Sequence, residues 1–408
     1  MTTPWLVYDD ANMMVTRKVF RSLASELKRA HANIERLRLS GDQGFFELPF
    51  ASVTEIERMA RKVQKRFDQL LVIGIGGSDL GARMLYSAIG GTKMRLSFLT
   101  NPDPDAVLNT LYGIDWDRTA VNVVSKSGTT LETRTLFEIA RQVCMKSVGK
   151  KQHADHFFVT TEESSTSELY VRANREGYTV IPHPTNVGGR FSVLSTVGLF
   201  PAACSGTNIQ RLLNGAKWLE EERRIKKEKS LPARFTTHHY LSMQEGRDMH
   251  VLMPYAETLF PFAMWFRQLW GESLGKKKNG VSVGPTPIAA FGPADQHSQI
   301  QLYNEGPDNK VITFILPDRF KRDIRIKGYP STTSIQRALC QGTATALKHN
   351  GRPNGTLHIP SVSPESVGAL LMMYETATAY MAQMLGVNAF DQPGVERGKS
   401  EALKLLKL

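Results

Sequence analysis

The residue types with the clearest chemical meaning in this sequence are four hydroxyls, a lysine and a glycine that crowd one short segment. They follow an apolar run at residues 120–124, which predicts a buried strand, and they precede a helical periodicity over residues 131–143. Unpaired backbone N–H groups at the start of a helix attract anions, and hydroxyls and an ammonium add donors. One helix cap needs only one hydroxyl, so the segment predicts a phosphate-binding turn made of Ser125, Lys126, Ser127, Gly128, Thr129 and Thr130.

A glycine-rich turn follows the predicted strand at residues 70–75 and invites a dinucleotide interpretation. That fingerprint would need a third glycine at position 79, where Asp79 stands instead. The next predicted strand, residues 96–99, ends without an acid that could hold a ribose. We therefore expect this turn to bring backbone N–H groups close to a small substrate, with Gly77 and Ser78 at its rim.

Two residues could exchange protons with a substrate. Glu272 lies among apolar residues near the end of a predicted helix that starts near Leu259. An apolar neighbourhood weakens the preference of a carboxylate for its charged form, which suits a general base. His297 lies in a segment that we expect to open a helix, and it is a candidate proton shuttle. The alternatives are a surface glutamate and a hydrogen-bonded structural histidine.

Two cations stand beside turns. Arg190 follows two glycines and precedes a predicted helix, so it could approach an oxyanion, although a structural arginine fits equally well. Lys399 falls in the first turns of a short final helix, where a solvated lysine is the alternative. The pair His238 and His239 could suggest a metal, but no third ligand stands at metal-site spacing, so we expect no metal site.

The bulk composition narrows the class of protein. The chain has 408 residues and a net charge of +12, which raises the question of a nucleic-acid partner. Its basic runs are interleaved with acids or bounded by glycine, and no nucleic-acid-binding motif accompanies them, so we expect no such partner. No apolar run approaches the roughly 20 residues of a membrane span, and no signal peptide is visible. Three widely spaced cysteines fit a reducing cytoplasm.

Strand-like and helical segments alternate along most of the chain, which predicts βαβ units and a parallel sheet. This pattern pauses over a largely helical region at residues 192–230 and then resumes. We expect two doubly wound, three-layer α/β domains joined by helices: a smaller one at 45–205 and a larger one at 206–408, on which segment 1–44 packs. The predicted strands are 70–75, 96–99, 120–124, 156–159, 178–181, 250–253, 287–290, 311–316 and 356–359.

Six segments together resemble the glucose-6-phosphate isomerase family. They span most of the chain, and their order makes a chance match very improbable. The matching segments are IGIGGSDLG (73–81), VSKSGTTLET (124–133), VGGRFSVLSTVGL (187–199), QLWGESLGK (268–276), GPADQHSQIQL (292–302) and FDQPGVERGK (390–399).

The resemblance implies two flavodoxin-like sugar-isomerase (SIS) domains and an aldose–ketose isomerase of glycolysis and gluconeogenesis that works in the cytoplasm without a cofactor. By motif match, the substrate phosphate would be held by Ser125, Lys126, Ser127 and Thr130, helped by Ser78. Glu272 would move a proton between C2 and C1 while Arg190 stabilises the cis-enediolate. His297, contributed by the second subunit of a homodimer, and Lys399 would open the sugar ring. Gln268 and Gln392 would position the sugar. The alternative is a sugar-phosphate sensor that has lost catalysis.

Overall fold

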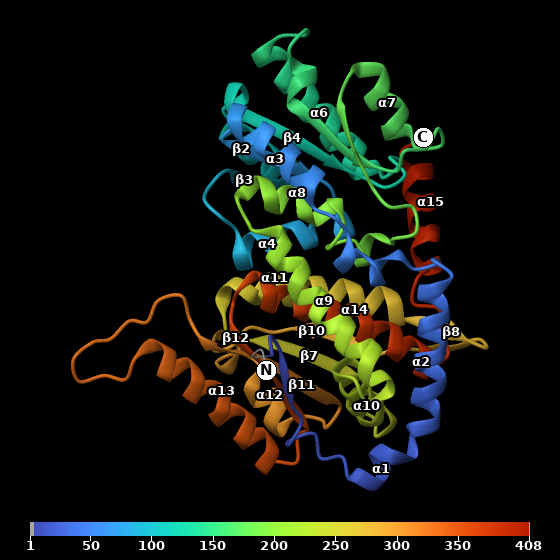
Figure 1. The fold of residues 1–408 in the computed structure, drawn as a ribbon, viewed down its shortest axis with the longest axis vertical. Coiled ribbons are helices and arrows are strands. Elements are labelled where there is room, and N and C mark those ends of the chain that lie inside the picture. The colour runs from blue at the N-terminus through green and yellow to red at the C-terminus, as the bar shows by residue number, and fades with distance from the viewer. Residues whose placement is uncertain (1–3, 408) are drawn as a thin grey trace. The chain divides into compact units, whose positions relative to one another are not determined.

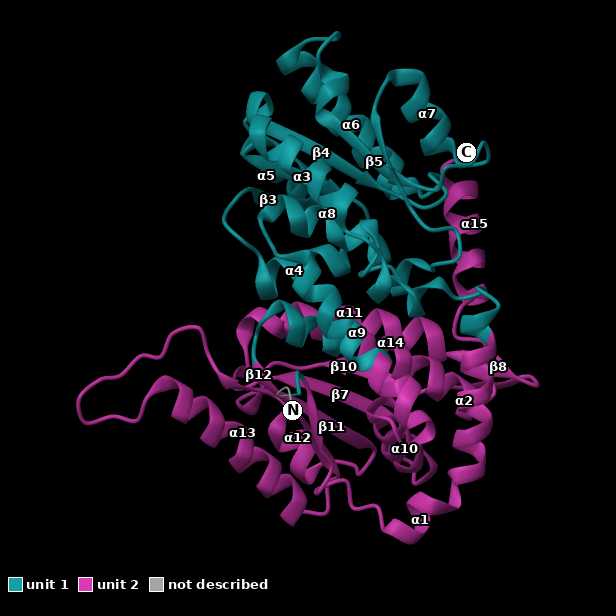
Figure 2. Ribbon diagram, in the orientation of Figure 1, with its two compact units in different colours: residues 1–5, 37–220, 361–371 teal, residues 6–36, 221–360, 372–408 magenta. Residues whose placement is uncertain are grey.

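The computed structural model describes residues 4–407 (Figure 1). The chain divides into two compact units, coloured teal and magenta in Figure 2. Unit 1 comprises residues 1–5, 37–220 and 361–371, and unit 2 comprises residues 6–36, 221–360 and 372–408. Each unit is built around its own five-stranded sheet, so the predicted α/β class is confirmed.

The sheet of unit 1 has the strand order β3-β2-β4-β5-β6, and all its neighbouring strands are parallel. Because parallel strands need crossover connections, helices alternate with these strands along the chain. The strands are β2 (Gln69–Ile73), β3 (Arg95–Leu99), β4 (Thr119–Val124), β5 (Phe157–Thr161) and β6 (Thr179–Pro182). The helices are α3 (Thr54–Arg66), α4 (Leu80–Ile89), α5 (Pro104–Tyr112), α6 (Leu131–Val148), α7 (Glu168–Glu176) and α8 (Thr196–Ser205).

Helices cover both faces of this sheet, which makes three layers. On one face, alternate strand residues such as Leu71, Val121 and Val159 pack with Leu136 of α6 and Ala173 of α7. Helix α8 packs against the sheet and also against α3 and α4. Every residue of the central strand β4 is buried. Such apolar, doubly covered strands are typical of parallel sheets, and they hold the loops at the strand ends firmly.

The sheet of unit 2 has the strand order β1-β12-β11-β7-β10. Strand β7 pairs in parallel with both β10 and β11, whereas β1 at the edge runs antiparallel to β12. The strands are β1 (Val7–Asp9), β7 (Met249–Pro254), β10 (Thr286–Ala289), β11 (Lys310–Arg319) and β12 (Asn354–Ser361). The helices are α1 (Arg17–Ser22), α10 (Leu231–Gln244), α11 (Phe260–Leu274), α12 (Ile300–Glu305), α13 (Thr332–His349) and α15 (Glu396–Leu405). Helices α2 (Ala24–Leu39), α9 (Ile209–Lys226) and α14 (Pro364–Leu385) have residues in both units.

The nine predicted strands all form, and the structure adds elements that the sequence pattern did not suggest. Edge strand β1 is only three residues long, and β8 (Lys276–Lys278) pairs with β9 (Val281–Val283) in a small antiparallel hairpin. The segment around His297 forms a 3-10 turn at Ala294–Gln296, and helix α12 begins only at Ile300. None of the helices within residues 4–407 has the length and apolarity needed to cross a bilayer.

Glu375 lies in the apolar interior of unit 2 on α14. Its side chain is fully buried, and neither carboxylate oxygen has a hydrogen-bond partner within the described chain. The preceding residue, Tyr374, packs against the rings of Phe235 and Phe266 at centroid distances of 5.4 and 5.3 Å. Burial raises the pKa of Glu375 well above its ordinary value, so the native environment favours the neutral acid.

Replacement of Glu375 by glutamine should therefore stabilise the protein increasingly as pH rises. The unfolded chain ionises Glu375 above its ordinary pKa of 4.5, whereas the native state resists ionisation. The wild type thus loses about 1.4 kcal/mol per pH unit above that value, until the raised pKa is reached, and Glu375→Gln does not. Melting temperatures measured from pH 5 to pH 8 should diverge in favour of the variant. A difference that is constant across this range would contradict the assignment.

Glu365, near the start of the same helix, offers a control of opposite sign. Burial alone would raise its pKa, but the guanidinium of Arg211, 2.9 Å from its Oε2, overcomes that effect and holds the pKa below its ordinary value. The ionised form therefore stabilises the native state above that ordinary value, and Glu365→Gln should lower the melting temperature at neutral pH.

Candidate active site

The predicted phosphate turn lies where β4 ends and α6 begins. Ser125 is buried, and its hydroxyl accepts a hydrogen bond from the N–H of Gly128 at 3.1 Å. The hydroxyls of Ser127 and Thr129 are exposed and lie 2.8 Å apart. Thr130 occupies the N-cap position of α6 but its side chain makes no capping hydrogen bond. The turn therefore presents hydroxyls beside a helix start that no cap side chain covers, which suits an anion.

Gly128 allows this turn to pack closely against helix α7. Its φ of +77° is a left-handed conformation that glycine adopts without strain. A Cβ atom at this position would lie only 2.4 Å from the backbone nitrogen of Leu169, in the first turn of α7. The shape of the phosphate turn thus depends on the position of α7.

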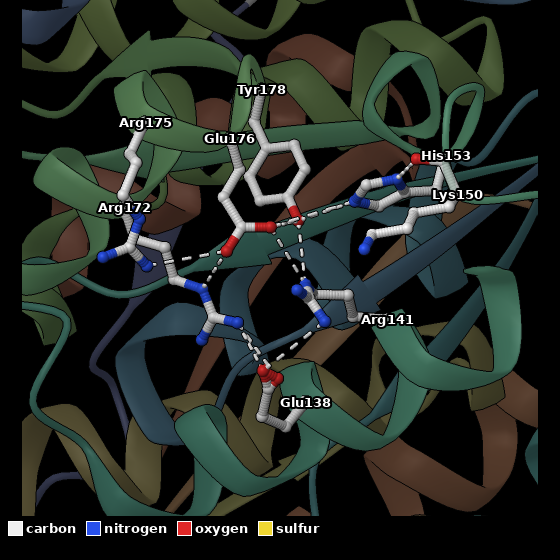
Figure 3. A network of polar contacts seen from close by, with 8 residues as sticks. All are labelled: Glu138, Arg141, Lys150, His153, Arg172, Arg175, Glu176 and Tyr178. Carbon is white, nitrogen blue, oxygen red and sulfur yellow. Dashed lines mark hydrogen bonds and ion pairs between the residues drawn. The ribbon is translucent and has the colours of Figure 1, made fainter.

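A network of ion pairs fixes α7 against α6 (Figure 3). Glu176 of α7 accepts hydrogen bonds from Arg141 of α6 at 3.1 Å and from the hydroxyl of Tyr178 at 2.9 Å. Arg172 of α7 bridges to Glu138 of α6, with 3.0 Å between its Nη2 and the second carboxylate oxygen. Burial alone would raise the pKa of Glu176, but Tyr178 and Arg141 hold it at about 2. Glu176 therefore stays ionised at every physiological pH.

Lys126 points from the phosphate turn toward the segment that leads to Arg190. Its ammonium lies 3.1 Å from the carboxylate of Glu162, and it donates hydrogen bonds to the carbonyl oxygens of Thr185 at 2.7 Å and Val187 at 3.3 Å. The lysine therefore ties the turn to the chain before Gly188. No sequence signal marked Glu162 as the partner of Lys126, because Glu162 follows β5 and lies 36 residues further along the chain.

The glycine turn at Gly76–Ser78 lies after β2 and is held by Asp79. Asp79 is 3% exposed, pairs with Arg83 at 2.9 Å, and accepts hydrogen bonds from the backbone of Gly76 and Leu80. Burial raises the pKa of Asp79 to about 6, against the opposing effect of Arg83. Asp79 is thus a structural carboxylate that shapes the turn, a role that motif matching alone does not reveal.

The glycine turn and the turn that carries Arg190 are in direct backbone contact. A Cβ atom on Gly77 would lie 2.3 Å from the carbonyl carbon of Gly189 and 2.8 Å from the nitrogen of Arg190. Arg190 is only 4% exposed, and its guanidinium lies 5.7 Å from the ring centroid of Phe191. Unit 1 therefore brings Gly77 and Ser78 next to Arg190.

In unit 2, a cavity of about 940 Å³ contains Glu272 and Gln392 in its lining. Glu272 is half-buried in the last turn of α11, and the amide of Gln268, one turn earlier, donates to its Oε1 at 3.2 Å. Lys276, a third lining residue, reaches Asp391: its ammonium lies 2.9 Å from that carboxylate and also contacts the carbonyl oxygen. This ion pair ties the end of α11 to the loop that carries Gln392.

His297 and Lys399 lie outside the described lining of this cavity. His297 is exposed at the end of the Ala294–Gln296 turn. Lys399 is exposed on α15 and pairs with Glu396 at 3.0 Å. Within residues 4–407, no three or more His, Cys, Asp or Glu side chains are grouped to hold a metal ion. Both ring nitrogens of His239 are instead engaged by Phe235 and Thr313.

These features define the class of the protein: two α/β units with the phosphosugar isomerase fold, one with the predicted phosphate turn and one with a glutamate in the lining of a cavity. The family model for phosphoglucose isomerase matches residues 56–347 and 334–407. The chain belongs to the phosphoglucose isomerase family.

One curated relative and two solved structures are similar to this chain over most of its length. The glucose-6-phosphate isomerase of Carboxydothermus hydrogenoformans is 37% identical over 92% of this chain and 88% of its own. The crystal structure of a hypothetical protein from Thermus thermophilus has a TM-score of 0.92 and 33% identity, covering 98% of this chain and 99% of that one. A glucose-6-phosphate isomerase from Chlamydia trachomatis shares the fold with a TM-score of 0.90 at 24% identity, covering 100% of this chain and 89% of that one.

The contact between the two turns of unit 1 leads to a paired prediction. Gly77→Ala should destabilise the protein by about 1–3 kcal/mol, because its new methyl group meets backbone atoms that have no room to move. Gly189→Ala approaches the same contact from the other side, where its Cβ would lie 3.8 Å from the Cα of Gly77, so it should change stability by less than about 0.5 kcal/mol. Denaturant unfolding of both variants measures the difference, and equal losses would argue against the contact.

Proposed function

We propose the roles of individual residues in the reaction of this enzyme, the interconversion of glucose 6-phosphate and fructose 6-phosphate. Glu272 acts as the base. It removes the proton from C2 of the open-chain aldose and returns it to C1, while the hydroxyl proton passes from O2 to O1, so that the C1=O1 double bond becomes a single bond and C2–O2 becomes the carbonyl. The intermediate is a cis-enediolate, whose negative charge Arg190 stabilises.

The phosphate group anchors the substrate in this proposal. Ser125, Ser127, Thr129 and Thr130 supply hydroxyl groups and backbone N–H groups, Lys126 supplies a cation, and Gly77 and Ser78 complete the site. Tight anchoring of a group that does not react holds the sugar carbons in a fixed place relative to the base.

Ring opening needs a second acid–base pair, because the substrate is mostly a closed ring. We assign it to His297 and Lys399, which move a proton to the ring oxygen and away from the C1 or C2 hydroxyl. Gln268 and Gln392 position the sugar hydroxyls. The observation that carries the whole proposal is Glu272 at a cavity, hydrogen-bonded by Gln268 and sharing that cavity with Gln392.

The test of the catalytic base is a coupled assay that reads glucose 6-phosphate formed from fructose 6-phosphate, with chelator present and no cofactor added. Wild type should turn over, and Glu272→Gln should lose about a hundredfold to ten-thousandfold in kcat, because the amide accepts no proton. The variant should still bind 6-phosphogluconate. Glu257→Gln, which removes an exposed carboxylate from the turn just before the same helix, is the matched control and should keep full activity. Substantial turnover by Glu272→Gln would remove Glu272 as the base.

We also propose a cytoplasmic homodimer in which the second subunit supplies His297. The exposure of His297 on its own protomer supports this, as do exposed apolar residues on the segment between β11 and α13, which extends away from the body of unit 2 (Figure 1). These residues are Ile324, Ile326 and Tyr329, with 62%, 65% and 74% of their surfaces exposed.

Three free, buried cysteines suit a reducing compartment. The sugar-isomerase domains at 45–205 and 206–408, with segment 1–44 packing on the second, belong to the same proposal.

Complementation tests the shared site. If each site combines Glu272 of one subunit with His297 of the other, a heterodimer of Glu272→Gln with His297→Ala has one intact site. Random reassembly of the two inactive variants should restore about a quarter of wild-type activity. The mixture is unfolded, refolded and assayed beside each variant alone. No recovery, with dimers present by light scattering, would show that each subunit uses its own histidine.

A further inference from the structure

All three N–H donors of Lys126 have acceptors within unit 1. Two are the carbonyl oxygens of Thr185 and Val187, and the third is Oε1 of Glu162 at 3.1 Å. An ammonium has three donors, so Lys126 is fully coordinated. Its charge is also matched, because Glu162 supplies one full negative charge beside it.

Glu162 is held in this place by its backbone. It directly follows β5, which pairs in parallel with β4, so both chain segments leave the same edge of the sheet. The N–H of Glu162 and the hydroxyl of Thr161 both donate to the carbonyl oxygen of Lys126, at 3.3 and 3.0 Å. The side chain of Glu162 is 20% exposed, and limited contact with water leaves its charge only partly screened.

We propose that Glu162 sets the phosphate affinity of the turn: its carboxylate offsets the charge of Lys126 and weakens the binding of a dianion. The proposal rests on the proposed function and assigns a determinant of affinity within that site. Both substrates carry the same phosphate, so its binding energy is uniform along the reaction. Binding energy that is equal for substrate and transition state lowers KM without raising kcat. A carboxylate that limits the binding energy of the phosphate therefore avoids tight retention of the product.

The competing view is that Glu162 is a strut that holds Lys126 in a productive position. The two views differ in sign. Removing a strut weakens phosphate binding, whereas removing an opposing charge strengthens it. A gain of affinity is not a consequence of structural damage, so the direction of the change separates the two.

The experiment is a calorimetric titration of the full-length protein with inorganic phosphate and with 6-phosphogluconate at low ionic strength. Glu162→Gln is nearly isosteric and should bind both about three- to tenfold more tightly, as expected for the loss of one negative charge a few ångströms from a dianion. Glu163→Gln makes the same change of charge at the next residue, which is exposed, and should shift affinity by less than twofold. In a Lys126→Met background, Glu162→Gln should still strengthen binding, because the carboxylate then opposes the phosphate without a counter-charge.

Steady-state kinetics on the same samples supply the second readout. Glu162→Gln should lower KM for both sugar phosphates by the same factor and leave kcat unchanged or reduced. Equal or weaker phosphate binding by a folded Glu162→Gln protein would overturn the proposal and favour the strut. If that variant does not fold, Glu162→Asp, which draws the carboxylate back by one methylene, should lower KM by a smaller factor, and an unchanged or higher KM would overturn the proposal equally. A wild type that binds phosphate but does not isomerise would instead overturn the proposed catalytic roles.

Discussion

The contact on which the rest of unit 1 depends is the approach of two backbones at Gly77 and Gly189. A side chain at Gly77 would overlap the carbonyl carbon of Gly189, so the two turns lie closer than any other residue at position 77 permits. Because Arg190 directly follows Gly189, its buried position depends on the shape of the glycine turn that Gly189 contacts. Asp79 and Arg83 in turn fix that shape. A cation proposed to stabilise an enediolate is thus placed in part by Asp79 and Arg83, to which we assign no role in the reaction.

The phosphate turn is placed in a similar way, by packing and not by its own hydrogen bonds alone. Gly128 lies against the start of α7, and the ion pairs around Glu176 hold α7 to α6 (Figure 3). Because Glu176 stays ionised far below neutral pH, the ion pairs between α7 and α6 do not change with pH near neutrality. Preorganised donors of this kind need no rearrangement when the anion arrives.

Sequence patterns were sufficient for the elements with strong periodicity and insufficient for the partners of single side chains. Buried strands such as β2 and β4 carry continuous apolar runs, and glycine and hydroxyl clusters mark the loops that follow them, so the α/β class and the positions of these loops could be predicted, whereas phosphate binding stays a prediction. The three-residue strand β1 and the β8–β9 hairpin carry no such run. The pairing of Glu162 with Lys126, or of Lys276 with Asp391, joins residues that are distant in sequence, and only the fold brings them together. The site roles of Glu272, His297 and Lys399 came from motif resemblance and stay predictions.

Charge at the phosphate turn acts on a different length scale from the charge of the whole chain. A net charge of +12 attracts anionic sugars over distances of about a Debye length, some 10 Å at 0.1 M salt. At the turn itself, the carboxylate of Glu162 lies 3.1 Å from the ammonium of Lys126, so the binding that we propose there relies more on hydroxyls and on the N–H groups at the start of α6. Those groups are directional, whereas a bare ammonium attracts any anion. In our proposal, long-range attraction and local selection are therefore separable, because Glu162 offsets the one lysine of the turn.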